Sequence, residues 1–378
     1  MRLHALYLAC GSCLLLACIG CGRSDGNSTP PPPSTPHFAY VSNSDSNTIT
    51  AYKMDSVSGA LSAITGSPSG TVNAPLGLAL SPNADLLAAG NLNGGGISVF
   101  HVNKTTGAIT TVTGSPFPTP GGGFPLSSEF HPTGKFFYAG MQVSTTSNVW
   151  AFSVEASTGV LTPVPGSPLT GQPSLGGGGV NSIALHPTGN FLYISGAFLG
   201  ITGYAVDPAN GALTQLARSP FVPAGAFLNS KIVVHPLGNF LFMADFDADG
   251  VRVFPIAADG SVGAEIAGSP FASGTGPRGI TLDPAGNFAY VIHDGDSSVA
   301  AFRVDTVTGA LTLAGTNNTG VGPFALTVET SGKFLYVTNQ SDGNVSAYSI
   351  DAHTGGLTKI AASPFAAGNS PISIVATK

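Results

Sequence analysis

The sequence predicts an all-β fold, a seven-bladed β-propeller of four-stranded blades whose ring is closed by the C-terminal strand. An aromatic residue at the end of an alternating apolar segment recurs at intervals of 46 to 52 residues. A glycine-containing turn follows each copy, and no helical periodicity competes with the period-two alternation. Seven copies of such a unit within one chain are the signature of a propeller. The recurring aromatics are Tyr52, Phe100, Phe152, Tyr204, Phe254, Phe302 and Tyr348.

The segment after each aromatic predicts a turn and then an outer strand. Most turns read like DSVSGAL or DTVTGAL, in which glycine supplies the positive φ and an acidic or amide side chain caps the turn. The outer strand is expected to end in Ser-Pro, which is tolerated at an outward-facing edge. The sixth unit has AGTNN instead of Ser-Pro. The Ser-Pro pairs start at Ser67, Ser115, Ser167, Ser219, Ser269 and Ser363.

Two further strands precede each aromatic. One is a segment like FLYV, found at 38–41, 136–139, 191–194, 240–243, 288–291 and 334–337, with a weaker copy at Leu86-Leu87. The other lies just upstream and reads PLGLALSP, VNSIALHP or PRGITLDP. With the aromatic strand and the outer strand, each unit therefore has four strands.

The two ends of the repeat region predict how the ring closes. Residues 37–43, HFAYVSN, match a second strand that has no first strand before it. Residues 371–378, PISIVATK, match a first strand that has no blade after it. We therefore expect residues 371–377 to form the innermost strand of the first blade, which would pair both open edges.

The N-terminus predicts export. Arg2 is followed by an apolar run from Leu3 to Ile19 and then Gly20-Cys21, which resembles a bacterial lipobox. We interpret residues 1–21 as a lipoprotein-type signal peptide with Cys21 as the lipidated residue; Cys18 is the alternative. An ordinary cleaved signal or a short anchor is the other interpretation, although the run is short for a spanning helix. Residues 22–36 form a Pro/Ser-rich tether to the propeller at 37–378.

The composition excludes two classes of function. Only 8% of the residues are charged, and 13 Lys plus Arg are too few to build a basic face for nucleic acid. All four cysteines lie within the first 21 residues, so the propeller has neither a disulfide framework nor a cysteine metal site.

Several segments resemble the YVTN repeat and the lactonase-like seven-bladed propellers. They are FLYVTN (334–339), NVSAYSID (344–351), HPTGKFFY, HPTGNFLY and TGALT. That group includes 6-phosphogluconolactonase-like and muconate-lactonizing enzymes. The resemblance implies site residues in three places. Where the enzymes carry two histidines, this chain has Leu228 and Ser230; where they carry Arg-His it has Arg278-Gly279; where they carry Asn-Glu it has His293-Asp294.

Alignment of the seven inner strands predicts which side chains face the channel. The position after the opening residue is Leu76, Leu126, Asn181, Ser230, Arg278, Phe324 and Ile372. Most channel positions are small or apolar, and Glu129, Lys231 and Arg278 break that pattern. We predict that Glu129, Asn181, Lys231 and Arg278 bind an anionic or hydroxylated ligand, with Arg278 clamping a carboxylate or phosphate. The structural alternative is that the charged groups pair with one another or with water.

Hydrolysis of a lactone needs a base that activates water and a donor for the oxyanion. Asp294 is the candidate base and Arg278 the candidate donor. His293 is an alternative base because its ordinary pKa lies near neutrality, and a solvated turn histidine is the other interpretation.

Two other polar groups have structural interpretations. His131, His186 and His235 occupy one equivalent turn position in separate blades, so they should not converge on a metal. The loop at 245–250, DFDADG, resembles the start of a calcium loop but has Ile256 at the twelfth position, so we interpret it as a hairpin turn.

The sequence thus predicts an exported, lipid-tethered propeller that acts as a monomer and binds a small molecule or glycan at its channel mouth. No metal or other cofactor is implied, and contact with a membrane would involve only the N-terminal lipid. The alternatives are a lactone hydrolase or lactonizing enzyme, and a protein-interaction scaffold in the cell envelope.

Overall fold

The computed structural model describes residues 36–69, 73–120, 123–142, 146–173, 179–196, 200–221 and 231–377. The predicted signal segment, Cys18, Cys21, the tether up to residue 35, Leu228 and Ser230 lie outside these residues. No helix long and apolar enough to cross a membrane is found in the described ranges. The unit from Pro36 onwards is built of strands and turns.

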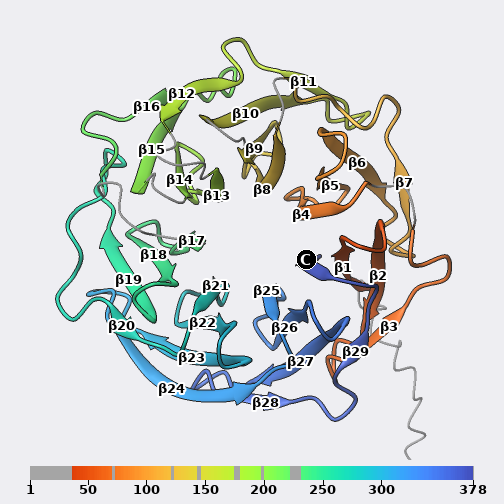
Figure 1. Cartoon of the computed structure of the whole chain (residues 1–378), viewed down its shortest axis with the longest axis vertical. Helices are drawn as coiled ribbons and strands as arrows, with labels where there is room; N and C mark the ends of the chain where they lie inside the picture. Colours follow the sequence, from red (N-terminus) through yellow and green to blue (C-terminus); the bar gives the residue numbers. More distant parts are fainter. Residues whose placement is uncertain are drawn as a thin grey trace, which may run out of the picture. The chain divides into compact units, whose positions relative to one another are not determined.

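Seven antiparallel sheets stand around one axis, as Figure 1 shows, and this confirms the predicted seven-bladed propeller. Blade 1 runs from β3 (Leu61–Ala63) through β2 (Thr48–Met54) and β1 (His37–Asn43) to β30 (Pro371–Ala376). Blade 2 has β4 (Pro75–Leu80), β5 (Leu86–Asn91), β6 (Ile97–Val102) and β7 (Ile109–Thr111). Blade 3 has β8 (Phe124–Phe130), β9 (Phe136–Gln142), β10 (Thr146–Val154), β11 (Leu161–Pro163) and the extra β12 (Leu169–Pro173).

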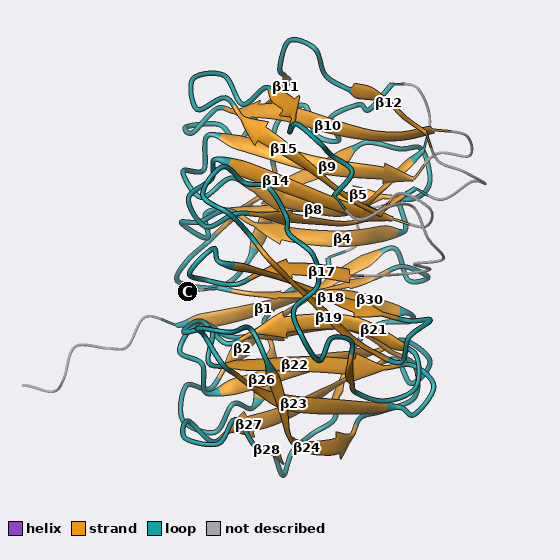
Figure 2. Cartoon of the chain, turned by 90° about the vertical axis from the view of Figure 1, so that its left-hand side faces the viewer, coloured by secondary structure: helices purple, strands orange, loops and turns teal. Residues whose placement is uncertain are grey.

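In the remaining blades the strands follow one another in chain order from the inner strand outwards. Figure 2 shows the sheets from the side. Blade 4 has β13 (Val180–Leu185), β14 (Phe191–Gly196), β15 (Gly200–Val206) and β16 (Leu213–Gln215). Blade 5 has β17 (Lys231–Val234), β18 (Phe240–Asp245), β19 (Gly250–Pro255) and β20 (Phe271–Ala272). Blade 6 has β21 (Pro277–Leu282), β22 (Phe288–His293), β23 (Ser298–Val304) and β24 (Leu311–Asn318). Blade 7 has β25 (Pro323–Val328), β26 (Phe334–Asn339), β27 (Asn344–Ile350), β28 (Leu357–Lys359) and β29 (Phe365–Ala366).

The C-terminal strand closes the ring as the sequence predicts. β30 pairs with β1 in antiparallel register, from Ala39 opposite Ala376 to Asn43 opposite Pro371. The backbone N–H of Phe38 donates to Oγ1 of Thr377 at 2.9 Å, and the N–H of Thr377 donates to the carbonyl of Phe38 at 2.8 Å. The first and last strands of the domain are therefore held in one sheet.

The repeated FLYV-type segments and glycine turns form a contact between neighbouring blades. The turn glycine of each blade lies against the first residue of the FLYV-type segment of the preceding blade. This residue is aromatic except in blade 2, where it is Leu86. The pairs are Gly59–Phe334, Gly107–Phe38, Gly159–Leu86, Gly211–Phe136, Gly260–Phe191, Gly309–Phe240 and Gly355–Phe288. A side chain on the glycine would occupy the space of that neighbour. The FLY-type and TGAL-type segments therefore form the two sides of one interface between blades.

A tyrosine hydroxyl completes this contact in five of the seven blades. It belongs to the third residue of the FLYV-type segment and donates to the carbonyl of the same turn glycine. The donors and acceptors are Tyr40–Gly107, Tyr138–Gly211, Tyr193–Gly260, Tyr290–Gly355 and Tyr336–Gly59, at 2.8 to 3.2 Å. The rings fill clusters of buried apolar side chains between the blades. These tyrosines are core residues.

The structure corrects the prediction that the outer strands end in Ser-Pro. In five blades a three-residue outer strand ends four residues before the serine, for example at Ala63 before Ser67. The serine hydroxyl then accepts the hydrogen bond of the third strand's N–H, as Ser67 does from Ala51 at 2.8 Å and Ser363 from Ala347 at 2.9 Å. A side chain thus replaces a ladder carbonyl. In blade 6, which lacks Ser-Pro, β24 continues to Asn318 instead.

Candidate ligand-binding site

A pocket of about 200 Å³ lies inside the ring of inner strands. Its walls are formed by residues near the N-terminal ends of β4, β8, β13, β17, β21, β25 and β30. Figure 1 labels β4, β8, β13, β17, β21 and β25 around its centre. The six described members of the predicted channel position all line the pocket: Leu76, Leu126, Asn181, Arg278, Phe324 and Ile372. The alignment of inner strands is therefore confirmed as a guide to the pocket wall.

Arg278 is held from two sides at the wall of the pocket. Its Nη1 atom donates to Oδ2 of Asp294 at 3.0 Å, and its Cζ atom lies 3.9 Å from the centroid of the Phe324 ring on the next blade. The ring face attracts the cation. Burial lowers the pKa of Arg278, an effect that the neighbouring Asp294 charge opposes. The arginine is therefore a charged, oriented donor.

The sequence alone did not indicate the contact between Arg278 and Phe324. Both residues occupy the same aligned position on adjacent blades. That placement is the signal that could have paired them.

Lys231 brings a second cation to the same wall. It opens β17, and its Nζ atom donates to the main-chain carbonyl of Asn181 on the neighbouring inner strand at 2.6 Å. Burial, and after it the positive charge of Arg278, lowers the pKa of Lys231 to about 8. Two like charges that disfavour one another in a partly dry site would both be stabilised by an anion.

Glu129 is placed differently from the other predicted ligand-binding residues. Its Oε2 atom accepts the backbone N–H of Leu185 at 2.9 Å and so links β8 to β13. Burial raises the pKa of this carboxyl to about 7. Glu129 is not among the described residues that line the pocket, whereas Asn181, Lys231 and Arg278 are.

His293 does not fit either of its predicted interpretations. It is the last residue of β22 and is completely buried, so it is not a solvated turn residue. Its Nδ1 atom lies 3.0 Å from Oγ of Ser298, and Nε2 is buried without a hydrogen-bond partner among the described residues. Burial lowers its pKa, against the opposing charges of Asp296 and Asp249. His293 is not among the residues lining the pocket, and the structure brings only Asp294 to Arg278.

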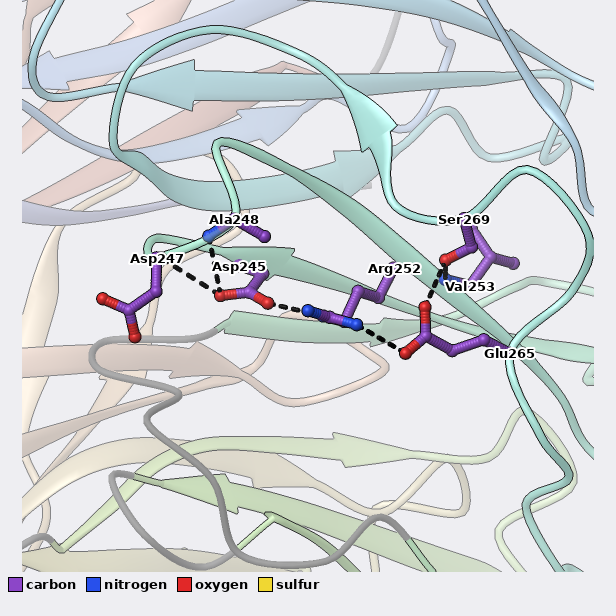
Figure 3. Close-up of polar contacts among 7 residues, drawn as sticks. All are labelled: Asp245, Asp247, Ala248, Arg252, Val253, Glu265 and Ser269. Carbon is purple, nitrogen blue, oxygen red and sulfur yellow. Dashed lines mark hydrogen bonds and ion pairs between the residues drawn. The ribbon is translucent and has the colours of Figure 1, made fainter.

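The aspartate-rich loop at 245–250 is a hairpin turn, as predicted. Figure 3 shows that the buried carboxylate of Asp245 accepts the backbone N–H groups of Asp247 and Ala248 and pairs with Arg252. Arg252 also binds Glu265 at 2.6 Å, and Glu265 accepts the hydroxyl of Ser269 at 2.9 Å. The acidic groups of Asp245 and Glu265 are thus used within blade 5.

The three turn histidines also have structural partners. Nε2 of His131, His186 and His235 lies 2.9 to 3.0 Å from the carbonyl of Gly189, Gly238 and Gly286, respectively, each in the next blade. They tie blades together at separate places, which confirms the interpretation as turn residues. Within the described ranges, no group of three or more His, Cys, Asp or Glu side chains is arranged to hold a metal ion.

Fold and site together define a closed seven-bladed propeller with a pocket inside its ring of inner strands, lined in part by Lys231 and Arg278. The family described as Lactonase, 7-bladed beta-propeller matches residues 34–123 and, in overlapping segments, 173–279, 231–316 and 266–375. The chain belongs to this family.

Curated relatives share part of the chain. A 6-phosphogluconolactonase of Pectobacterium atrosepticum is 29% identical over 143 residues, which are 36% of this chain and 42% of the relative. One from Yersinia pestis is 24% identical over 192 residues, 50% of this chain and 55% of the relative. The aligned regions thus span about half of these relatives or less.

Solved structures share the fold over almost the whole chain. The Pseudomonas aeruginosa periplasmic gluconolactonase superposes with a TM-score of 0.73 at 19% identity, covering 91% of this chain and 99% of that one. A putative 6-phosphogluconolactonase of Bacteroides fragilis gives a TM-score of 0.75 at 20% identity, covering 92% and 100%.

Proposed function

We propose that the channel mouth binds a small carboxylate, or the neutral lactone that yields one on hydrolysis. The observation that carries this proposal is the pair of cations on one wall of the pocket. Arg278 and Lys231 contribute two positive charges, and Asp294 beside Arg278 contributes one negative charge, which leaves an excess of one. Fixed cations in a partly buried pocket favour a bound anion over water.

The comparisons with known proteins support a ligand of this class, and the N-terminal sequence supports a location outside the cytoplasm. The curated relatives are named as lactonases of a sugar acid, and one solved neighbour is a periplasmic gluconolactonase. The signal-like run and Cys21 lead us to propose that the propeller is lipid-anchored in the bacterial cell envelope. It would meet its ligand outside the cytoplasm.

Substitution of Arg278 is expected to abolish most of the affinity for monocarboxylates. Arg278→Gln removes the charge and the planar donor, so the dissociation constant should rise about 10- to 100-fold. Isothermal titration of the purified protein with gluconate and hexanoate measures this. Lys333→Gln is the matched control, because Lys333 is an exposed turn cation that does not line the pocket. Equal affinity in the wild type and Arg278→Gln would contradict the proposal.

The same titration carried out across pH tests Lys231. Its pKa of about 8 means that the ammonium is charged below that pH and neutral above it. A bound anion favours the charged form, so affinity should be full below pH 8. Above pH 8 it should fall by up to about tenfold per pH unit. Lys231→Gln should flatten this dependence.

Lactone hydrolysis is the second candidate function, and the Arg278–Asp294 pair favours it. Asp294 is 36% exposed at the mouth, within reach of water. Its carboxylate would take a proton from a water that attacks the carbonyl carbon, while Arg278 donates to the developing oxyanion. The ring C–O bond then breaks, and the proton passes from the carboxyl group to the ring oxygen. The product is a hydroxy acid.

A panel of sugar and aliphatic lactones tests this reaction. We expect turnover by the wild type and at least a 100-fold loss in both Arg278→Ala and Asp294→Ala. Turnover that survives in both variants would exclude this site. No turnover above buffer would exclude hydrolysis of the tested lactones and leave the binding proposal unaffected.

A further inference from the structure

The pocket wall is divided into two chemically different halves. The polar half comes from three adjacent inner strands, β13, β17 and β21, which supply Asn181, Lys231 and Arg278. The other half comes from the four adjacent strands β25, β30, β4 and β8. These supply the apolar side chains Phe324, Ile372, Leu76 and Leu126 at the same level. The ligand therefore meets charge on one side and hydrocarbon on the other.

The nearby serine oxygens are already used or covered. Oγ of Ser373 accepts the backbone N–H of Leu78 at 3.1 Å, and Oγ of Ser127 accepts that of Ile183 at 3.1 Å. Oγ of Ser128 is buried and lacks a hydrogen-bond partner among the described residues. Ser373 and Ser127 hold neighbouring inner strands together through these bonds, and beside them the four apolar side chains present carbon atoms to a ligand.

We infer that the ligand of this pocket is a monocarboxylate with an apolar body, or the matching aliphatic lactone, in preference to a polyhydroxylated or phosphorylated sugar acid. The inference rests on the proposed binding function and specifies its ligand class. Hydroxyl groups turned toward the apolar half would lose water without gaining a partner, which is costly. Methylene groups in the same place gain free energy from burial. One excess positive charge matches a carboxylate better than a phosphate dianion.

Hexanoate and gluconate form a matched pair for the test, because they share a six-carbon chain and one carboxylate and differ in the hydroxyl groups. Titration of the wild-type protein should show hexanoate binding at least tenfold more tightly. Leu126→Asn should weaken hexanoate about tenfold and leave gluconate unchanged or slightly tighter. Leu126 is suited to this change because it is partly exposed in the channel. Val57→Asn, on a turn where Val57 is 88% exposed, is the control and should change neither affinity.

The outcomes separate the two proposals. Tighter binding of gluconate than of hexanoate would overturn the inference about the ligand body and leave the carboxylate site intact. Equal weakening of both ligands by Leu126→Asn would also overturn it. Binding of neither ligand would overturn the proposed function together with the inference. The wild-type comparison needs no variant, so it decides the question even if Leu126→Asn fails to fold.

Discussion

Deletion of residues 371–378 is expected to abolish the cooperative unfolding of the propeller. β30 lies between β25 and β4 in the ring of inner strands and pairs with β1 along five positions. Its loss would remove the buried side chains of Ile372 and Ile374 and leave the β1 backbone groups that face β30 unpaired. The edge of β1 would then be free, and β25 and β4 would lose the strand that lies between them.

Urea unfolding followed by circular dichroism measures this effect. The full protein should show one steep transition, and the truncated protein a broad loss of signal or aggregation. Deletion of Lys378 alone is the control, because it shortens the chain without removing any residue of β30. A truncated protein that unfolds like the full chain would disprove closure by β30. The same deletion removes Ile372 and Ser373 from the pocket wall, so ligand affinity should disappear with it.

Alanine at Gly107 is expected to destabilise the protein by about 2 to 5 kcal/mol. Gly107 has a φ of +75°, and a Cβ atom there would overlap the ring of Phe38, which is buried. The left-handed backbone costs about 1 to 2 kcal/mol, and overpacking of the core costs about 1 to 3 kcal/mol more. Movement of the turn would also disturb the hydrogen bond from Tyr40 to the Gly107 carbonyl.

Gly66→Ala separates the two causes. Gly66 has a φ of +83°, but no atom lies within 4 Å of the place that a Cβ atom would take, so only the backbone penalty of about 1 to 2 kcal/mol applies. The free energy of unfolding from urea titration should therefore fall about twice as much in Gly107→Ala as in Gly66→Ala. Equal losses would show that the contact between Gly107 and Phe38 does not stabilise the blade interface.

Both stability predictions concern contacts that repeat around the ring, whereas the ligand predictions concern positions where the repeat is broken. Arg278 occupies a channel position that carries Leu76, Phe324 or Ile372 in other blades. A propeller keeps its core contacts between blades, so its channel ends are free to differ. The site therefore arises from the departures from the repeat.

Blade number, strand order, closure by residues 371–377 and the channel-facing positions could all be predicted from the amino-acid sequence. These features depend on period-two alternation and on turn residues, both of which are local and repeat with the blade. The wall residues Asn181, Lys231 and Arg278 could be predicted for the same reason.

The meeting of side chains from different segments could be read only from the folded chain. The Oγ atom of Ser67 takes the place of a strand carbonyl because the outer strand of its blade ends before it. His293 is buried because the loop around Gly274 packs over it. Arg278 stacks on Phe324, and Glu129 binds the Leu185 backbone, because their partners stand on neighbouring blades. Such contacts depend on the distance and angle between sheets, and these are set by packing around the whole ring rather than by any one segment.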